Sequence, residues 1–426
     1  MKAREARPTG AARRVERTYL VLVLGNTLAA SFIWGINTLF LLDAGLSNLE
    51  AFSANAFFTV GIVLFEIPTG VVADTWGRRA SYLMGTVTLA ATTLLYVALW
   101  QVGGAPFWQW AVSSVLLGLG FTFFSGALEA WVVDALRHEG WLGGLEGVFS
   151  RAQVVTGAAM LTGSVAGGLV AQVTTLGVPY VLRVGMLLVM TVVASVFMRD
   201  LGFTPDRSRP ARAVVRDVAG VSWRAAAANP PVRHLMAAGA FTSGVLFYAF
   251  YAMQPFLLEL YGEGGAYAVA GLAAAVVAGS QIVGGLAAPR LRRVVRRRTT
   301  AILVAVVLGA VVLALLGLTR SFAVALVLLV VFGLAQAAVT PIRQALLNDL
   351  VPSAQRATLL SADSLVAGVG GVAVQPALGR VADGWGYGGS YVVGAAVQLL
   401  AVPLVHRARR GAGAADHRSD GPVPSA

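Results

Sequence analysis

Long apolar runs alternate with short polar segments from one end of this chain to the other. A helix needs about 20 mostly apolar residues to cross the roughly 30 Å hydrocarbon layer of a membrane. Because the runs recur at that length, the pattern predicts an all-α membrane protein with 12 transmembrane helices. We expect these helices at residues 19–42, 49–72, 80–101, 107–136, 148–173, 180–197, 234–261, 266–288, 299–318, 322–347, 358–378 and 387–405.

One polar interruption is much longer than the others and carries seven Arg and four Pro. It leaves six apolar runs on either side, so we predict two pseudo-symmetric six-helix bundles joined by a linker. The predicted division is an N-terminal tail 1–18, a bundle 19–198, a linker 199–233, a bundle 234–406 and a disordered C-terminal tail 407–426.

The net charge of +12 does not indicate nucleic-acid binding, because the basic residues gather in alternate loops. With the N-terminus in the cytoplasm, 29 of the 32 Lys and Arg residues fall on the cytoplasmic side, and cytoplasmic loops carry such an excess. Lys2 is the only lysine, which together with abundant Ala, Val and Gly suggests a bacterial source. We therefore expect a multi-pass protein of the cell (inner or plasma) membrane, with the tails and linker cytoplasmic and the lipid bilayer as its surroundings.

The chain has no cysteine, which excludes disulfides and thiolate chemistry. Its four histidines, at positions 138, 234, 406 and 417, stand apart without metal-ligand spacing. The sequence has no nucleotide-binding loop and no nucleophile–base spacing. We therefore expect neither an enzyme nor a protein with a metal or cofactor.

The loop between the second and third predicted helices reads GVVADTWGRR. Gly70 permits close helix approach, Gly77 permits a tight turn, and Asp74 can pair with an arginine or lie at a helix N-terminus. With Arg78 and Arg79, these residues match every fixed position of G-x-x-x-D-x-x-G-R-[RK], the signature loop of the major facilitator superfamily. The chain resembles that superfamily over nearly its whole length.

The resemblance implies the fold of that superfamily and transport of a small molecule by alternating access, by a monomer. It implies that Asp74 faces the N-terminus of helix 358–378 in the outward-open state and that Arg78 pairs with Asp134, which would latch the two halves together. A topology anchor without a switching role is the alternative. Residues 348–361 and 371–379 look like bacterial drug-efflux members of the superfamily.

The fifth predicted helix contains Gly163, Ser164, Gly167 and Gly168. The spacing resembles the antiporter motif of drug–proton exchangers, G-P-x-x-G-G, with Ser164 in place of the proline. The resemblance implies export in exchange for protons. Small residues at this spacing also let helices pack closely, which is the alternative explanation.

Three acids lie within predicted spans away from the span ends, where a charge is costly and usually functional. Glu66 lies in FEIPTG, which resembles a superfamily subgroup with E-x-P-T-G, and we expect it to be the proton carrier, buried in its span. Glu129 and Asp363 are the next candidates. For Glu66, a structural ion pair is the alternative.

Polar and aromatic residues on the first, seventh and tenth helices are candidates for substrate binding, since helices one, four, seven and ten surround the substrate in this superfamily. Packing is the alternative for each of them, and Arg343 is either a snorkelling charge or an anion contact. The candidates are Asn26, Trp34, Asn37, Phe247, Tyr248, Tyr251, Gln254 and Arg343.

The first hypothesis for function is therefore proton-coupled efflux of a hydrophobic or cationic small molecule. The alternative is uptake or facilitated transport of a sugar, an organic acid or another metabolite, because one fold serves many substrates. A sensor or scaffold without transport is a third hypothesis, which would be expected to carry an added soluble domain or long loop.

Overall fold

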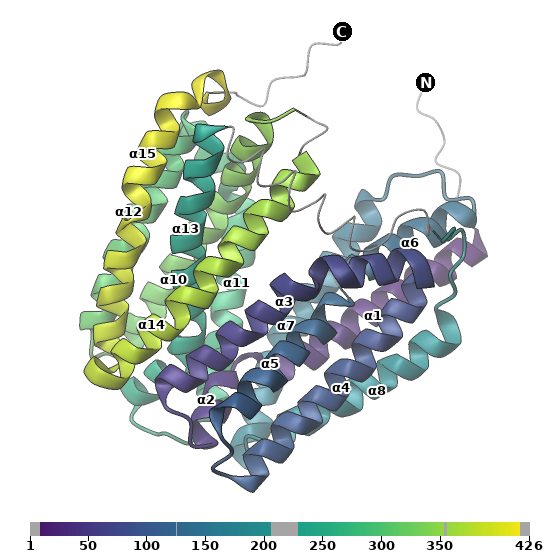
Figure 1. Ribbon diagram of the computed structural model, residues 1–426, viewed down its shortest axis with the longest axis horizontal. Helices are drawn as coiled ribbons and strands as arrows, with labels where there is room; N and C mark the ends of the chain where they lie inside the picture. Colours follow the sequence, from purple (N-terminus) through teal and green to yellow (C-terminus); the bar gives the residue numbers. More distant parts are fainter. Residues whose placement is uncertain (1–8, 125, 206–228, 353–355, 418–426) are drawn as a thin grey trace. The chain divides into compact units, whose positions relative to one another are not determined.

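The computed structural model describes residues 9–124, 126–205, 229–352 and 356–417, and the regular secondary structure of this part of the chain is entirely helical (Figure 1). The helices of the first half are α1 Gly10–Trp34, α2 Asn37–Asp43, α3 Asn48–Trp76, α4 Arg78–Val102, α5 Phe107–Thr122, α6 Ala127–His138, α7 Glu146–Val173 and α8 Val178–Phe197. The second half contains α10 Pro230–Tyr261, α11 Tyr267–Val294, α12 Arg298–Leu318, α13 Phe322–Asp349, α14 Arg356–Leu399, α15 Ala401–Gly411 and the short 3-10 helix η2 Gly413–Asp416.

The described residues contain 11 helical segments that are long and apolar enough to cross a membrane. The last of them, Leu359–Gly411, passes through Gly386, whose φ of 70° and ψ of 175° are not helical. α14 is therefore two helices that meet at Gly386, and the segment accounts for two crossings. The prediction of an all-α fold with twelve crossings is confirmed.

Three predicted helices are broken in the structure. The last, 387–405, is interrupted at Leu400, between α14 and α15, and the other two are broken near glycines. The first divides into α1 and α2 at Gly35, and the fourth divides into α5 and α6 around Gly126, whose φ of 72° lies in the left-handed region that favours glycine. α1 also begins at Gly10, inside the predicted tail, because the Thr9 hydroxyl accepts a hydrogen bond from the Ala12 amide at 3.0 Å and caps the helix.

The C-terminal tail is ordered further than predicted. α15 continues to Gly411, and the 3-10 helix η2 follows it. Asp416, which is only 3% exposed, accepts hydrogen bonds from the backbone amide and the hydroxyl of Thr299 at 2.7 and 2.8 Å. The acid caps the first turn of α12 and thereby fixes the chain that leads to it, so residues 407–417 do not form the disordered tail expected there.

The chain divides into two compact units that do not coincide with the two predicted bundles. Unit 1 comprises Met1–Leu46, Phe57–Val215 and Gly265–Ala275, and unit 2 comprises Ser47–Ala56, Arg216–Gly264 and Val276–Ala426. The beginning of α3 thus belongs to unit 2, and the beginning of α11 belongs to unit 1. Most of the predicted linker, residues 206–228, lies outside the described residues.

Contacts inside unit 2 explain why it includes the start of α3. The carboxylate of Asp383, on α14, accepts hydrogen bonds from the amides of Asn48 and Leu49 at 2.9 and 3.0 Å. The Tyr387 hydroxyl donates to the Asn48 side chain at 2.5 Å. These bonds satisfy amide groups that the first turn of a helix otherwise leaves unpaired.

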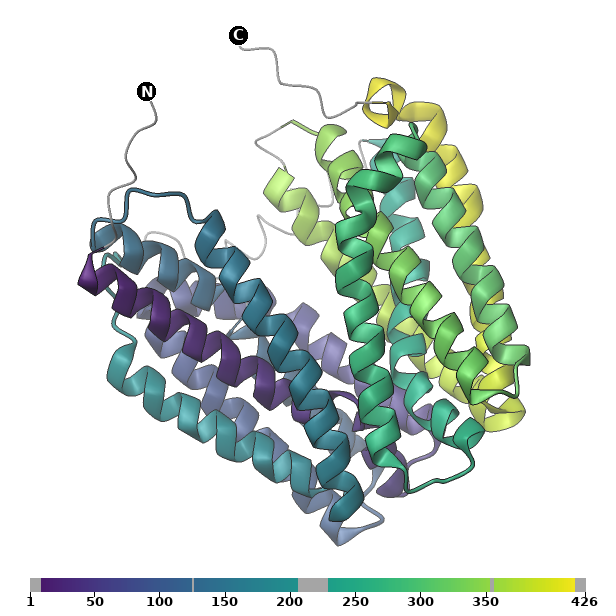
Figure 2. The same cartoon turned by 180° about the vertical axis from the view of Figure 1, so that it is seen from behind.

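Within unit 1, α1 packs along α7 and α8, and α4 packs along α5 and α8 (Figures 1 and 2). The core of these helices includes Tyr19, Tyr82 and Trp131, which are almost completely buried. Within unit 2, α14 packs along α10 and α12, and α15 lies beside α10. The helices around α13 enclose the cavity described below.

Candidate functional site

The α3–α4 loop turns at Gly77, which has a φ of 110° that favours glycine. A Cβ at this position would also overlap the Asp200 carboxylate. That carboxylate accepts a hydrogen bond from the Arg79 amide at 2.9 Å, while the Arg79 guanidinium donates to the Ser195 carbonyl at 2.6 Å. Gly77 and Arg79 thus connect the start of α4 to the end of α8 and the residues after it.

Arg78 lies between two acids of unit 1. Its guanidinium forms an ion pair with Asp74 at 2.6 Å, and its Nε lies 4.0 Å from the Asp134 carboxylate. The guanidinium also lies 5.7 Å from the centre of the Phe203 ring, within cation–π range. The predicted partners Asp74 and Asp134 are therefore gathered around one arginine. Contact between Asp74 and helix 358–378 would join different units and stays a prediction.

Asp200 is a member of this cluster that the sequence did not identify. It follows the last apolar run of the first half, and its partners at Gly77 and Arg79 lie more than 120 residues earlier in the chain. An acid that follows a transmembrane helix is ordinary in a sequence, so no local pattern marks it.

The glycines of α7 lie in tight helix contacts. A Cβ at Gly163 would come within 2.6 Å of Ser31, and a Cβ at Gly167 would overlap the Phe32 carbonyl, so both are required for packing on α1. A Cβ at Gly168 would lie 2.5 Å from the Tyr267 carbonyl at the start of α11. Ser164 is 1% exposed, and its hydroxyl has no hydrogen-bond partner among the described residues. Packing accounts for the glycines, and their role in antiport stays a prediction.

The two candidate acids of the first half are exposed, contrary to the expectation of burial. Glu66 lies about 15 Å before the end of α3, and it has no ion pair with any described residue. Gly61 packs against the backbone of Val115 on α5, and five residues of helix turn the side chain by about 140° away from that contact. Glu129 lies exposed in the first turn of α6.

Asp363 forms an ion pair with Arg343 within unit 2. Arg343 donates from Nη1 and Nη2 to the two carboxylate oxygens at 2.7 and 2.6 Å, which is the bidentate geometry of a strong pair. Nη2 also donates to the Leu235 carbonyl at 3.1 Å. The two side chains are 19% and 12% exposed, and Asp363 lies about 10 Å along α14 from its start. The structure thus joins a candidate proton carrier to a candidate substrate contact.

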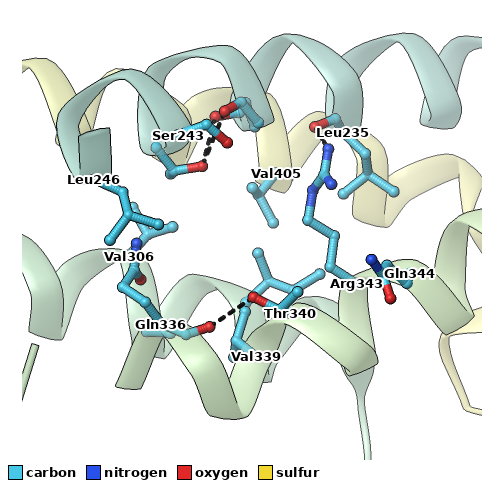
Figure 3. A pocket seen from close by; sticks show the side chains of 15 residues that line it. Leu235, Ser243, Leu246, Val306, Gln336, Val339, Thr340, Arg343, Gln344 and Val405 are labelled. Atoms are coloured by element: carbon cyan, nitrogen blue, oxygen red, sulfur yellow. Dashed lines mark hydrogen bonds between the residues drawn. The ribbon is translucent and has the colours of Figure 1, made fainter. Parts of the chain in front are cut away.

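A cavity of about 130 Å³ borders this ion pair (Figure 3). Arg343 extends along one end of it toward Leu235, and Ser243, Leu246 and Gln336 lie at the other end. Its lining combines hydroxyl and amide groups with aliphatic side chains. The lining residues come from α10, α12, α13 and α15: Leu235, Ala238, Gly239, Thr242, Ser243, Leu246, Ile302, Ala305, Val306, Gln336, Val339, Thr340, Arg343, Gln344 and Val405.

The other substrate candidates are not gathered in this cavity. Asn26 accepts a hydrogen bond from the Tyr82 hydroxyl at 2.8 Å, and Asn37 accepts one from the Tyr180 hydroxyl at 3.0 Å, so both have structural partners. Trp34 is partly buried.

On α10, the candidates differ in exposure. Tyr248 and Gln254 are 1% exposed, and the Tyr248 hydroxyl donates to Ser390, so both belong to the packed interior. Tyr251 is partly buried beside Phe250, with ring centres 5.5 Å apart. Phe247 is 38% exposed. Among the described residues, no group of three His, Cys, Asp or Glu side chains is placed to hold a metal ion.

Comparison with known proteins agrees with this architecture. The sequence profile of the Major Facilitator Superfamily matches residues 19–375. A search of curated proteins gives no match.

Solved structures of transporters resemble the chain in fold. The nucleoside transporter NupG (D323A mutant) gives a TM-score of 0.78 at 10% identity, with 92% of this chain and 99% of that chain covered. A bacterial homolog of the human lysosomal transporter Spinster, inward-facing and occupied, gives 0.73 at 13% identity over 97% and 100%. The POT family transporter PepTSo gives 0.72 at 13% identity over 96% and 100%. At these identities the likeness shows the fold alone.

Proposed function

The chain belongs to the major facilitator superfamily, and we propose that it is a proton-coupled secondary transporter of a small metabolite that forms hydrogen bonds. The observation that supports this substrate class is the cavity beside Arg343, where hydroxyl and amide groups alternate with aliphatic side chains. Such a mixed lining is typical of sites that orient a ligand with a few polar contacts. Asp363 is already paired with Arg343, so this cavity offers no free negative charge to a cation.

The acids inside the spans support coupling to protons. Asp363 is held in an ion pair, and Glu66 is an exposed carboxylate within α3. A carboxylate within a span faces protein or water in preference to lipid, because a charge in hydrocarbon is costly. Glu66 and Asp363 are therefore our candidates for groups that gain and lose a proton during the cycle, with Glu129 as the third.

We propose alternating access by the two halves about a site near the middle of the membrane. The α3–α4 loop is the candidate latch, since Arg78 lies between Asp74 and Asp134. The charge asymmetry of the loops, with 29 of 32 basic residues on one side, supports an orientation in which both termini and this loop are cytoplasmic. The proposed setting is a bacterial cell membrane, with the protein acting as a monomer.

Drug export in exchange for protons is the second candidate function. It rests on the glycine pattern of α7 and on the efflux-like segments near α14. The packing contacts of Gly163, Gly167 and Gly168 provide another reason for the pattern. Exposed Glu66 and Glu129 would be the groups available to a cationic drug.

Proton movement in liposomes separates the two candidates. The purified protein would be placed in liposomes that enclose a pH-sensitive dye, and uridine, glucose, lactate or ethidium would be added outside, with protein-free liposomes as blanks. We expect at least one of the three metabolites to acidify the lumen, because substrate and proton enter together, and ethidium to give no signal. The Glu66→Gln and Asp363→Asn variants identify the carrier, and Glu263→Gln, in an exposed loop, is the matched control.

Alkalinisation of the lumen on addition of ethidium would favour drug–proton exchange and would exclude the proposed substrate class. The absence of a protein-dependent pH change with all four compounds would contradict proton coupling.

A further inference from the structure

We propose that the cavity beside Arg343 binds the carboxylate of a small lipophilic organic acid, and that Asp363 takes up one proton as this carboxylate replaces it on the guanidinium. The inference rests on the proposed function and names its substrate class. It follows from three features: the Arg343–Asp363 ion pair, the cavity that Arg343 lines, and the cost of changing the net charge of the pair.

The structure holds the Arg343 guanidinium in place at the edge of the cavity. Asp363 and the Leu235 carbonyl accept three of its five N–H groups. A Cβ at position 239 would overlap Nη2, so Gly239 leaves the space in which the guanidinium lies. The planar N–H pair that now holds the Asp363 carboxylate has the right geometry for any other carboxylate.

Charge conservation links proton binding to anion binding at this pair. Protonation of Asp363 alone would leave Arg343 as an unpaired cation in a low-dielectric span, and arrival of an anion alone would leave two carboxylates on one guanidinium. When Asp363 gains a proton and a ligand carboxylate binds Arg343, the net charge of the site is unchanged. Each event therefore favours the other, as reciprocal linkage requires.

The rest of the cavity lining indicates the size and polarity of the part of the ligand that lies beyond its carboxylate. Beyond Arg343 the lining includes Leu246, Val306 and Val339, with the amide of Gln336 among them (Figure 3). A volume of about 130 Å³ is close to that of an engineered cavity of about 150 Å³ that holds benzene. A purely structural ion pair would not need such a cavity beside it. The fit is to a carboxylate with a compact apolar body, for which benzoate is a suitable probe.

The other titratable groups near the pair must be considered before a pH effect is assigned to Asp363. Among the described residues, Arg343 is the charged group in hydrogen-bond contact with Asp363. On the packed helices, His234 precedes Leu235 on α10, and His406 follows Val405 on α15. α12 and α13 carry a second ion pair, Arg298 with Asp349 at 2.7 Å, whose residues do not line the cavity.

The test measures benzoate binding and proton uptake by the purified protein in detergent, between about pH 6 and pH 9, where benzoate stays ionised. We expect benzoate to bind at least tenfold more tightly than benzamide, its uncharged match in shape. We expect close to one proton to be taken up for each benzoate bound. Because one proton is taken up with each benzoate, the affinity should fall about tenfold for each unit of rising pH over the range in which this uptake occurs.

Variants assign these effects to the pair. Asp363→Asn should bind benzoate with no proton uptake and no pH dependence. Arg343→Gln leaves Asp363 unpaired and can unfold, so the neutral double variant Arg343→Gln/Asp363→Asn is included, and it should stay folded but bind benzoate at least tenfold more weakly. Asp349→Asn, in the second ion pair, should bind like the wild type, and so should His234→Gln and His406→Gln.

Equal binding of benzoate and benzamide, proton uptake that persists in Asp363→Asn, or tight benzoate binding by the double variant would each overturn the inference. So would loss of the pH dependence in either histidine variant, and so would failure of the wild type to bind benzoate. In that last case, a proton signal with uridine or glucose in liposomes would leave the proposed function standing. Benzoate binding with proton uptake but no flux of any metabolite would instead contradict the proposed function alone.

Discussion

Because Gly239, on α10, has no side chain, it leaves space for Arg343 of the neighbouring helix α13. The Arg343 guanidinium occupies the volume where a Cβ would lie, and from there it reaches both Asp363 and the Leu235 carbonyl. Glycine costs helix stability relative to alanine, by roughly 1 kcal/mol in an exposed helix. At this position the cost is offset by the space that the glycine gives to a partly buried ion pair.

Gly239→Ala should therefore displace Arg343 and destabilise the protein by about 1–3 kcal/mol, the usual cost of overpacking. Thermal unfolding of the purified variant in detergent measures the effect. Gly185→Ala, on α8, is the matched control, because a Cβ added there would have no heavy atom within 4 Å; it should leave stability unchanged or raise it. Similar unfolding temperatures for the two variants would show that position 239 has no special constraint.

Among the helices, α4 depends on an acid from a distant part of the chain. Its first turn has no capping side chain of its own, and Asp200 provides the acceptor for the Arg79 amide. Asp200→Ala should destabilise the protein by about 0.5–2 kcal/mol, the range found for lost helix caps. Glu263→Ala removes an exposed loop acid and should stay within about 0.5 kcal/mol of the wild type. Equal stability of the two variants would contradict the capping role.

The start of α3 depends in the same way on Asp383. Asp383→Ala removes the acceptor for the amides of Asn48 and Leu49, so these residues should lose protection against hydrogen exchange. Mass spectrometry of exchange would follow peptides from residues 47–56 and 57–76. We expect faster exchange in the first peptide and little change in the second, with Glu263→Ala again as the control. Unchanged exchange at residues 47–56 would show that other contacts hold this turn.

At the scale of the whole molecule, two helices are divided between the compact units. α3 begins in unit 2 and continues in unit 1, while α11 begins in unit 1 and continues in unit 2. The predicted linker is thus not the sole covalent connection between the units, since α3 and α11 each pass from one to the other.

A chain cut after residue 215 should therefore still assemble from its two pieces. When residues 1–215 and 216–426 are co-expressed with a tag on one piece, we expect the other piece to co-purify, because unit 2 contains residues 47–56 of the first piece. Asp383→Ala should lower the recovery, and Glu263→Ala should not. Pieces that purify separately would show that the shared helix ends contribute little to assembly.

The transmembrane crossings can be predicted from the sequence. The contacts between side chains that are distant in the chain cannot. Apolar length alone decides whether a helix spans, so the twelve crossings follow from it. The breaks at Gly35 and Gly126 could not be predicted, because glycine is common in intact transmembrane helices. Arg343 and Asp363 were both identified, but separately, since their pairing depends on how α13 and α14 pack. Asp200 carries no local pattern at all.

The zero net charge of the Arg343–Asp363 ion pair determines how transport should respond to the membrane potential. In the exchange that we propose, Arg343, Asp363, the ligand carboxylate and the proton together carry the same net charge as the empty pair. A site whose net charge is zero in both its empty and its loaded form experiences no electrical work when it crosses the field, whatever the membrane potential. A potassium diffusion potential set with valinomycin should therefore leave the rate of carboxylate transport unchanged, while a pH gradient of equal driving force should change it.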